Sequence, residues 1–156
     1  MKSDRLETAS NLSKTMTRHI IIIDCDHIRR EAARKALQPE GFEAITFECG
    51  KDATRHLLFN STEGAVVDFG SAHEPSSAIP DGKRIVQQIM EINTFLPLVL
   101  VSDRSDVLDE ETVSAADSVV LHPVSTIQLK DALNTVLSET LRERTQQKSG
   151  SIHAFR

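Results

Sequence analysis

The stretch that decides the fold is Ile20-Ile21-Ile22-Ile23-Asp24-Cys25-Asp26, in which four β-branched apolar residues are followed by two carboxylates around a thiol. Four consecutive isoleucines without polar alternation predict a strand that is covered on both faces, as in a parallel sheet. Ligands of open α/β sheets bind outside the carboxyl ends of the strands. We therefore expect Asp24 and Asp26 to lie where chemistry takes place.

Composition limits the classes of protein that need to be considered. The chain has 156 residues, a length typical of one domain, and its 23 acidic residues against 18 Lys and Arg give a formal net charge of -5. No basic cluster interleaved with aromatic residues occurs, which argues against direct nucleic-acid binding. No signal peptide or apolar run of membrane-spanning length is present, so we expect a cytoplasmic protein without a membrane partner. Cys25 and Cys49 lack metal-binding spacing and are expected to be reduced thiols.

Strand and helix patterns alternate along the chain. The expected strands cover 20–23, 42–47, 65–68, 98–102 and 119–121, and the expected helices cover 27–38, 51–59, 81–94, about 106–116 and 125–142. Strict alternation of five strands with five helices predicts a doubly wound α/β domain with a parallel sheet. We expect this domain to span residues 19–144, between a disordered leader over 1–18 and a flexible tail over 145–156.

Polar side chains follow four of the five expected strands. Asp24 and Asp26 follow the first strand, Asp68 ends the third, Ser102 ends the fourth and His122 follows the fifth. Because parallel strands end at one edge of the sheet, we expect these side chains around one crevice. Clustered carboxylates repel one another unless a cation intervenes, which suggests Mg²⁺. A carboxylate beside Mg²⁺ and a phosphodonor can become an aspartyl phosphate.

Five short motifs carry a resemblance to a known family. They are Ile-Ile-Ile-Asp-x-Asp at 21–26, Val-Val-Asp at 66–68, Pro-Asp-Gly at 80–82, Leu-Val-Leu-Val-Ser at 98–102 and Ala-Ala-Asp-Ser-Val-Val-Leu-His-Pro at 115–123. The last is similar to the pattern Gly-Ala-Asp-Asp-Tyr-Leu-x-Lys-Pro. In this order, the motifs make the span 19–144 resemble the CheY-like receiver domain of bacterial two-component response regulators.

The resemblance implies a flavodoxin-like (βα)5 sandwich with a parallel five-stranded sheet of order 2-1-3-4-5. It also implies that Asp68 accepts a phosphoryl group from a histidine kinase or phosphotransfer protein, and that Ser102 is the switch hydroxyl. His122 stands in place of the family's lysine, and Asp24, Asp26 and Asp68 would hold Mg²⁺. The implied output is contact with a downstream protein or a homodimer. No effector domain follows residue 144, so we expect a separate output partner or a longer regulator.

Several positions depart from the family pattern. Cys25 replaces the second of two adjacent acids, His122 replaces a lysine that carries a permanent charge, and Val119 replaces the switch aromatic. His122 precedes Pro123, which we expect in the cis form. Two versions of the function stay open: a phosphoacceptor at Asp68, or a pseudo-receiver that signals without phosphorylation. We expect no enzyme in either version, and at most self-phosphorylation and autodephosphorylation at Asp68 in the first. In the simplest interpretation, the carboxylates after the first strand only cap the helix that follows.

Two alternatives belong to other classes of protein. A haloacid-dehalogenase-type phosphatase would use Asp24 as nucleophile, Asp26 as acid and Ser102 in its second motif. However, no suitable lysine followed by Gly-Asp-x-x-x-Asp comes after Ser102, and the length leaves no room for a cap domain. A flavodoxin would need a Ser/Thr/Gly-rich phosphate cradle after the first strand, where Asp24-Cys25-Asp26 stands instead.

Overall fold

The computed structural model describes residues 17–48, 50–68, 81–102 and 109–139. The expected tail, most of the expected leader, the loop 69–80 and Cys49 lie outside these ranges, so the domain boundaries remain predictions. Arg18, which we assigned to the leader, is the first residue of strand β1.

The elements alternate as predicted. The strands are β1 (Arg18–Ile23), β2 (Phe42–Phe47), β3 (Gly64–Asp68), β4 (Leu98–Ser102) and β5 (Ser118–Leu121). The helices are α2 (His27–Leu37), α3 (Gly50–Phe59), α4 (Asp81–Ile92), α5 (Glu110–Ala115) and α6 (Thr126–Ser138), with a short 3-10 turn, η1 (Gln38–Glu40), after α2. None of the helices in the described ranges is both long and apolar enough to cross a bilayer.

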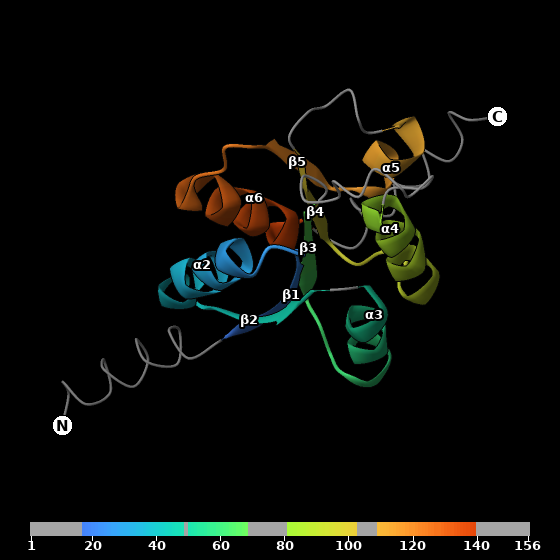
Figure 1. The fold of residues 1–156 in the computed structure, drawn as a ribbon, viewed down its shortest axis with the longest axis horizontal. Coiled ribbons are helices and arrows are strands. Elements are labelled where there is room, and N and C mark those ends of the chain that lie inside the picture. Colours follow the sequence, from blue (N-terminus) through green and yellow to red (C-terminus); the bar gives the residue numbers. More distant parts are fainter. Residues whose placement is uncertain (1–16, 49, 69–80, 103–108, 140–156) are drawn as a thin grey trace.

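The strands form one parallel sheet of order β2-β1-β3-β4-β5, which confirms the predicted flavodoxin-like topology. Helices α2 and α6 cover one face of the sheet, and α3, α4 and α5 lie on the other (Figure 1). The order changes direction at β1 and β3, because the chain moves from β1 outward to β2 and then returns to β3. This change of direction is the place where open α/β sheets bind ligands.

The four isoleucines of β1 lie at the centre of this three-layer arrangement. Ile20 and Ile22 pack in the apolar cluster under α2 and α6, and Ile21 and Ile23 pack in the cluster under α3 and α4. None is more than 2% exposed, and burying each contributes roughly 1.5–3 kcal/mol relative to leaving it exposed. This packing on both faces fixes the strand and thereby the position of Asp24, which follows it.

Polar side chains cap the starts of α2, α5 and α6. Asp26 caps α2 and Asp109 caps α5, each accepting a hydrogen bond from a backbone N–H three residues on. Ser125 and Gln128 form a reciprocal capping box at the start of α6. After η1 the chain turns at Gly41, whose φ of 90° is strained for residues with a side chain. These caps place the starts of α2 and α6 beside the carboxyl ends of β1 and β5.

Candidate functional site

The carboxyl edge of the sheet brings the predicted polar residues together. Asp68 and Ser102 are the last residues of β3 and β4, and Asp24 and His122 directly follow β1 and β5. Asp24 and Ser102 are buried, at 4% and 2% exposure. The backbone N–H of His122 donates to the Ser102 carbonyl at 2.8 Å, which extends the ladder past the end of β5. The predicted polar side chains therefore do lie at one edge of the sheet, and the carboxylates of Asp24 and Asp68 are largely shielded from water.

Asp68 is paired with His122. The His122 Nε2 lies 2.9 Å from the Asp68 Oδ2, and the two side chains are 20% and 7% exposed. An imidazole with its proton on Nε2 can donate to a carboxylate in its neutral as well as its charged form. The His122–Pro123 peptide bond is cis, as predicted. The histidine in place of the family's lysine thus contacts the predicted phosphoacceptor directly.

Asp24 is held by a residue that the sequence analysis did not select, Arg29 of α2. The Arg29 Nε donates to the Asp24 Oδ2 and its Nη2 donates to the Asp24 Oδ1, both at 3.1 Å. This two-pronged geometry is the strong form of an arginine–carboxylate pair. The Arg29 Nε also lies 3.9 Å from the Asp68 Oδ2. The hydrogen bonds to Asp24, followed by the nearby charge of Asp68, raise the pKa of the guanidinium, which stays charged.

Asp26 has a structural role in the described conformation. Its Oδ1 accepts a hydrogen bond from the Arg29 backbone N–H at 3.0 Å, as expected of a helix cap. That hydrogen bond is the main cause of a lowered pKa for Asp26, and it outweighs the opposing effect of burial. The Asp26 backbone N–H in turn donates to the Asp24 Oδ1 at 2.9 Å. The capping interpretation is therefore confirmed for Asp26, while Asp24 accepts hydrogen bonds without capping through its side chain.

A divalent ion such as Mg²⁺ requires several oxygen ligands whose lone pairs are available to it. Both oxygens of Asp24 already accept hydrogen bonds, and Cys25, where the family has an acid, is exposed. Across the ranges that the structure covers, no group of three His, Cys, Asp or Glu side chains is placed to hold a metal ion. In this conformation the residues present do not fit a magnesium ion. The ligand set Asp24, Asp26 and Asp68 stays a prediction.

A signal for Arg29 was present in the sequence. Arg29 and Arg30 lie in the first turn of α2, where the positive end of the helix dipole disfavours cations. A basic pair at this position indicates partners that compensate for the unfavourable field. Arg29 has Asp24, and the Arg30 Nη1 donates to the backbone carbonyl of Asp24 at 3.2 Å. The partners could not be named beforehand, because they depend on how the strand directs its last carboxylate.

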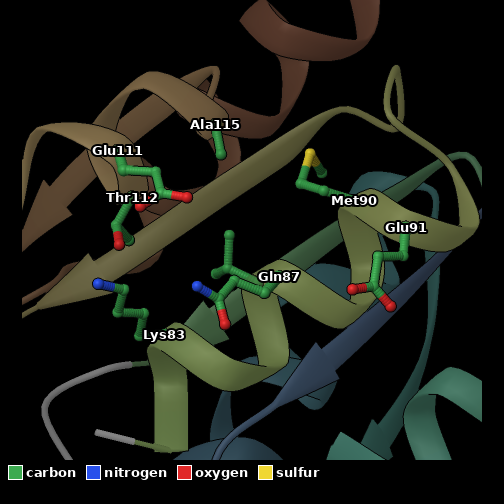
Figure 2. A pocket seen from close by; sticks show the side chains of 8 residues that line it. Lys83, Gln87, Met90, Glu91, Glu111, Thr112 and Ala115 are labelled. Atoms are coloured by element: carbon green, nitrogen blue, oxygen red, sulfur yellow. The ribbon is translucent and has the colours of Figure 1, made fainter. Parts of the chain in front are cut away.

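A second hollow lies between α4 and α5, away from the paired carboxylates. It has a volume of about 440 Å³, and its lining includes Lys83, Met90 and Glu111 (Figure 2). Lys83 donates to Asp109 at 2.6 Å, and this bond, with a weaker contribution from Thr112, lowers the pKa of Asp109 to about 2. The lysine that lines this hollow is thus paired with Asp109, and we assign no chemistry to the hollow.

Comparisons with known proteins give a consistent result for the fold. No family model and no curated protein sequence matches the chain. Among solved structures, the response regulator TrrA of Thermotoga maritima, determined with Mg²⁺-BeF, is 21% identical, with a TM-score of 0.66 over 77% of this chain and 99% of its own. A CheY-like receiver domain of Methylobacillus flagellatus is 19% identical, with a TM-score of 0.65 over 77% and 98%.

A third neighbour is the receiver domain of a sensor histidine kinase of Pseudomonas aeruginosa, which has a magnesium ion coordinated in its active-site cleft. It is 15% identical, with a TM-score of 0.66 over 79% of this chain and 99% of its own. The chain therefore has the fold of CheY-like response-regulator receiver domains, as its motifs predicted. The haloacid-dehalogenase alternative is not favoured by these neighbours.

Proposed function

We propose that this chain is a receiver module of two-component signalling that acts through protein contacts, in the version that does not depend on phosphorylation of Asp68. The observation that carries the proposal is the pairing of both buried carboxylates with side chains of the chain itself. Asp24 is held by Arg29 through two hydrogen bonds, and Asp68 is held by His122 at 2.9 Å. A carboxylate bound in this way is a poorer nucleophile, because its lone pairs face donors.

Two replaced residues support the same version. Val119 stands where the family has its switch aromatic, and it packs, partly buried, against the apolar cluster under α3 and α4. A valine has no ring to swing between a buried and an exposed position. Cys25 supplies no carboxylate to a cation. The movements and ligands that the phosphorylation switch of the family requires are therefore missing at two separate points.

The partners in this proposal rest on analogy with other receiver domains. A receiver module without chemistry of its own exerts its effect by docking on other proteins, here a downstream output protein or a second copy of the chain. No enzymatic activity belongs to this version; self-phosphorylation and autodephosphorylation at Asp68 belong only to the second version. A histidine kinase or phosphotransfer protein belongs to the proposal as a docking partner, and becomes a phosphodonor only in the second version.

The second version, with Asp68 as phosphoacceptor, is favoured by the position of three residues. Asp68, Ser102 and His122 come from the ends of neighbouring strands, where a phosphoryl group on Asp68 would meet a hydroxyl and an imidazole. Magnesium belongs to this version, and it is consistent with the two neighbours that hold this ion. It would need the oxygens of Asp24 and Asp68, and Asp24 is bound by Arg29 here.

Intact-mass spectrometry distinguishes the two versions. The wild type and Asp68→Asn are incubated with MgCl2 and a small-molecule phosphodonor such as acetyl phosphate. We expect no adduct on either chain. The triple substitution Cys25→Asp, Arg29→Met and His122→Lys should gain one phosphoryl group, which a further Asp68→Asn removes. One adduct on the wild type that Asp68→Asn abolishes would overturn the phosphorylation-independent version and establish the phosphoacceptor.

A phosphate-release assay with a phosphomonoester, on the same chains and on Asp24→Asn, tests the phosphatase alternative. A haloacid-dehalogenase-type enzyme would turn over phosphomonoesters with Asp24 as nucleophile, and its activity would survive Asp68→Asn. The bidentate contact with Arg29 argues against that role, because both Asp24 oxygens accept hydrogen bonds from the guanidinium. This alternative would be supported if the wild type released more inorganic phosphate than there is protein, and if Asp24→Asn abolished the release while Asp68→Asn did not.

A further inference from the structure

Two acidic side chains of the site are buried side by side with a guanidinium. The carboxylates of Asp24 and Asp68 are 5% and 7% exposed, and the Arg29 guanidinium contacts both. Burying a carboxylate without a compensating positive charge is strongly unfavourable, and two that share a site also repel each other. Some cation must therefore accompany them, and in this structure that cation is supplied by α2.

Arg29 has the geometry for this role. Its two hydrogen bonds to Asp24 use separate nitrogens and separate oxygens, which aligns the planar fork with the carboxylate. The same Nε that donates to Asp24 lies 3.9 Å from the Asp68 Oδ2, so one guanidinium bridges two strands. The backbone of Arg29 is fixed as well, because its N–H donates to the Asp26 cap at 3.0 Å. Both ends of this residue are thus positioned by the site.

A divalent ion would compete for the same oxygens. Magnesium requires nearly octahedral oxygen ligation at short distances, which leaves no room for a hydrogen-bonded guanidinium on the same carboxylate edge. The side chain of Asp26 is directed to the helix backbone, and the thiol of Cys25 is a poor ligand for a hard cation. Repulsion between the guanidinium and a dication adds to this competition.

We propose that Arg29 is the resident cation of this site, bridging Asp24 and Asp68 in the place of a divalent metal, so that Mg²⁺ binds only by displacing it. This inference deepens the proposed function and rests on the receiver interpretation of the same edge. It defines a way of regulating the site: whatever draws Arg29 away, such as a partner carboxylate, opens the carboxylates to metal. The test involves no phosphoryl transfer, so the two proposals can fail separately.

The test is thermal unfolding with and without millimolar MgCl2 at constant ionic strength, supported by Mn²⁺ broadening of amide resonances. The chains are the wild type, Arg29→Met, and Arg34→Met as matched control, since Arg34 pairs with Glu31 on the same helix away from the site. We expect the midpoint of the wild type and of the control to be insensitive to Mg²⁺. Arg29→Met should be destabilised without Mg²⁺, stabilised by adding it, and bind the ion at least about tenfold more tightly than the wild type.

Two further measurements keep the inference testable if Arg29→Met does not fold. Arg29→Lys keeps the charge without the fork and should bind Mn²⁺ with intermediate affinity. The wild type alone also suffices: Mn²⁺ should broaden the amides around Asp24 and Asp68 no more than those at the far ends of the strands. The inference would be overturned if submillimolar Mn²⁺ selectively broadened the amide resonances of the wild-type site. It would also be overturned if Mg²⁺ shifted the unfolding midpoints of the wild type and of Arg29→Met equally. A phosphoryl adduct that forms on the wild type without Mg²⁺ would instead refute only the proposed function.

Discussion

Two helix starts in this molecule carry an aspartate cap and a carboxylate–cation pair, and the two pairs differ in the burial of the carboxylate, since both cations are partly exposed. At α2, Asp26 caps the helix, and Arg29 pairs with Asp24, whose side chain is 5% exposed. At α5, Asp109 is itself the cap, and it pairs with Lys83, with side chains 44% and 30% exposed. The first pair is bidentate and joins two strands to a helix, while the second is a single contact between α4 and α5.

The comparison shows that burial determines how much stability is lost when one partner of a salt bridge is removed. In water an ion pair gains little, because solvent screens it and holding two long side chains costs entropy. In a buried place the net gain is also small, but removing one partner leaves an unpaired charge and is costly. The pair at α5 therefore connects two helices weakly, whereas Arg29 at α2 supplies a positive charge beside two buried carboxylates.

The largest effect is expected from Arg29→Met. Because Asp24 and Asp68 then lose their guanidinium while buried, we expect the free energy of unfolding to fall by about 2–3 kcal/mol, somewhat less than for a fully buried pair because Arg29 is partly exposed. Urea denaturation at pH 7 without divalent ions measures this. The control Arg34→Met should cost much less, because solvent screens the pair of Arg34 with Glu31. Equal losses in the two variants would remove the distinction between the buried and the exposed pairs.

An intermediate effect is expected from Asp109→Asn, which keeps an acceptor for the helix cap but removes the charge. The folded pKa of Asp109 is lowered to about 2, below the ordinary value of 3.8, by the bond from Lys83 and the cap. Its contribution is therefore complete above about pH 5 and is lost progressively as the pH falls from about 5 to below 2. Because Asp109 is well exposed, we expect the variant to lose only about 0.5–1 kcal/mol at pH 7.

Urea denaturation of the wild type and of Asp109→Asn between pH 2 and pH 8 measures the contribution of the Asp109 carboxylate to the free energy of unfolding. The difference in unfolding free energy should be constant from pH 5 to pH 8 and shrink below pH 4. A difference that grew on acidification would contradict the lowered pKa of Asp109.

The smallest effect is expected from Lys83→Met. The lysine is not a cap, so its loss removes only a screened contact with Asp109 and should lower the stability slightly, less than Asp109→Asn does, at low salt. At 1 M NaCl, where the Debye length is about 3 Å, wild type and variant should be equally stable. A cost that persisted in high salt would show that the stem of Lys83 matters through packing at the hollow between α4 and α5.

The sequence predicted the fold well, because the signals for it are local. The isoleucine run indicated a strand buried on both faces, and the tips of β3 and β4 were placed at the right residues, Asp68 and Ser102. The strand order came from the resemblance and was confirmed by the sheet. Arg29 was missed because its role depends on a rotamer and on contacts between β1, β3 and α2, which no spacing rule encodes. The inverted charge at the start of α2 was the one available clue.

The most direct measurement of the central claim is the side-chain Nε–H resonance of Arg29 in solution. A guanidinium bound to a buried carboxylate should exchange its Nε–H slowly with water, in contrast to that of Arg84, which is exposed on α4. We expect a slowly exchanging Arg29 resonance that is unchanged by millimolar Mg²⁺ and is lost in Asp24→Asn. An Arg29 Nε–H that exchanges as fast as that of Arg84, or that disappears when Mg²⁺ is added at low concentration, would contradict the claim that this arginine is the resident cation of the site.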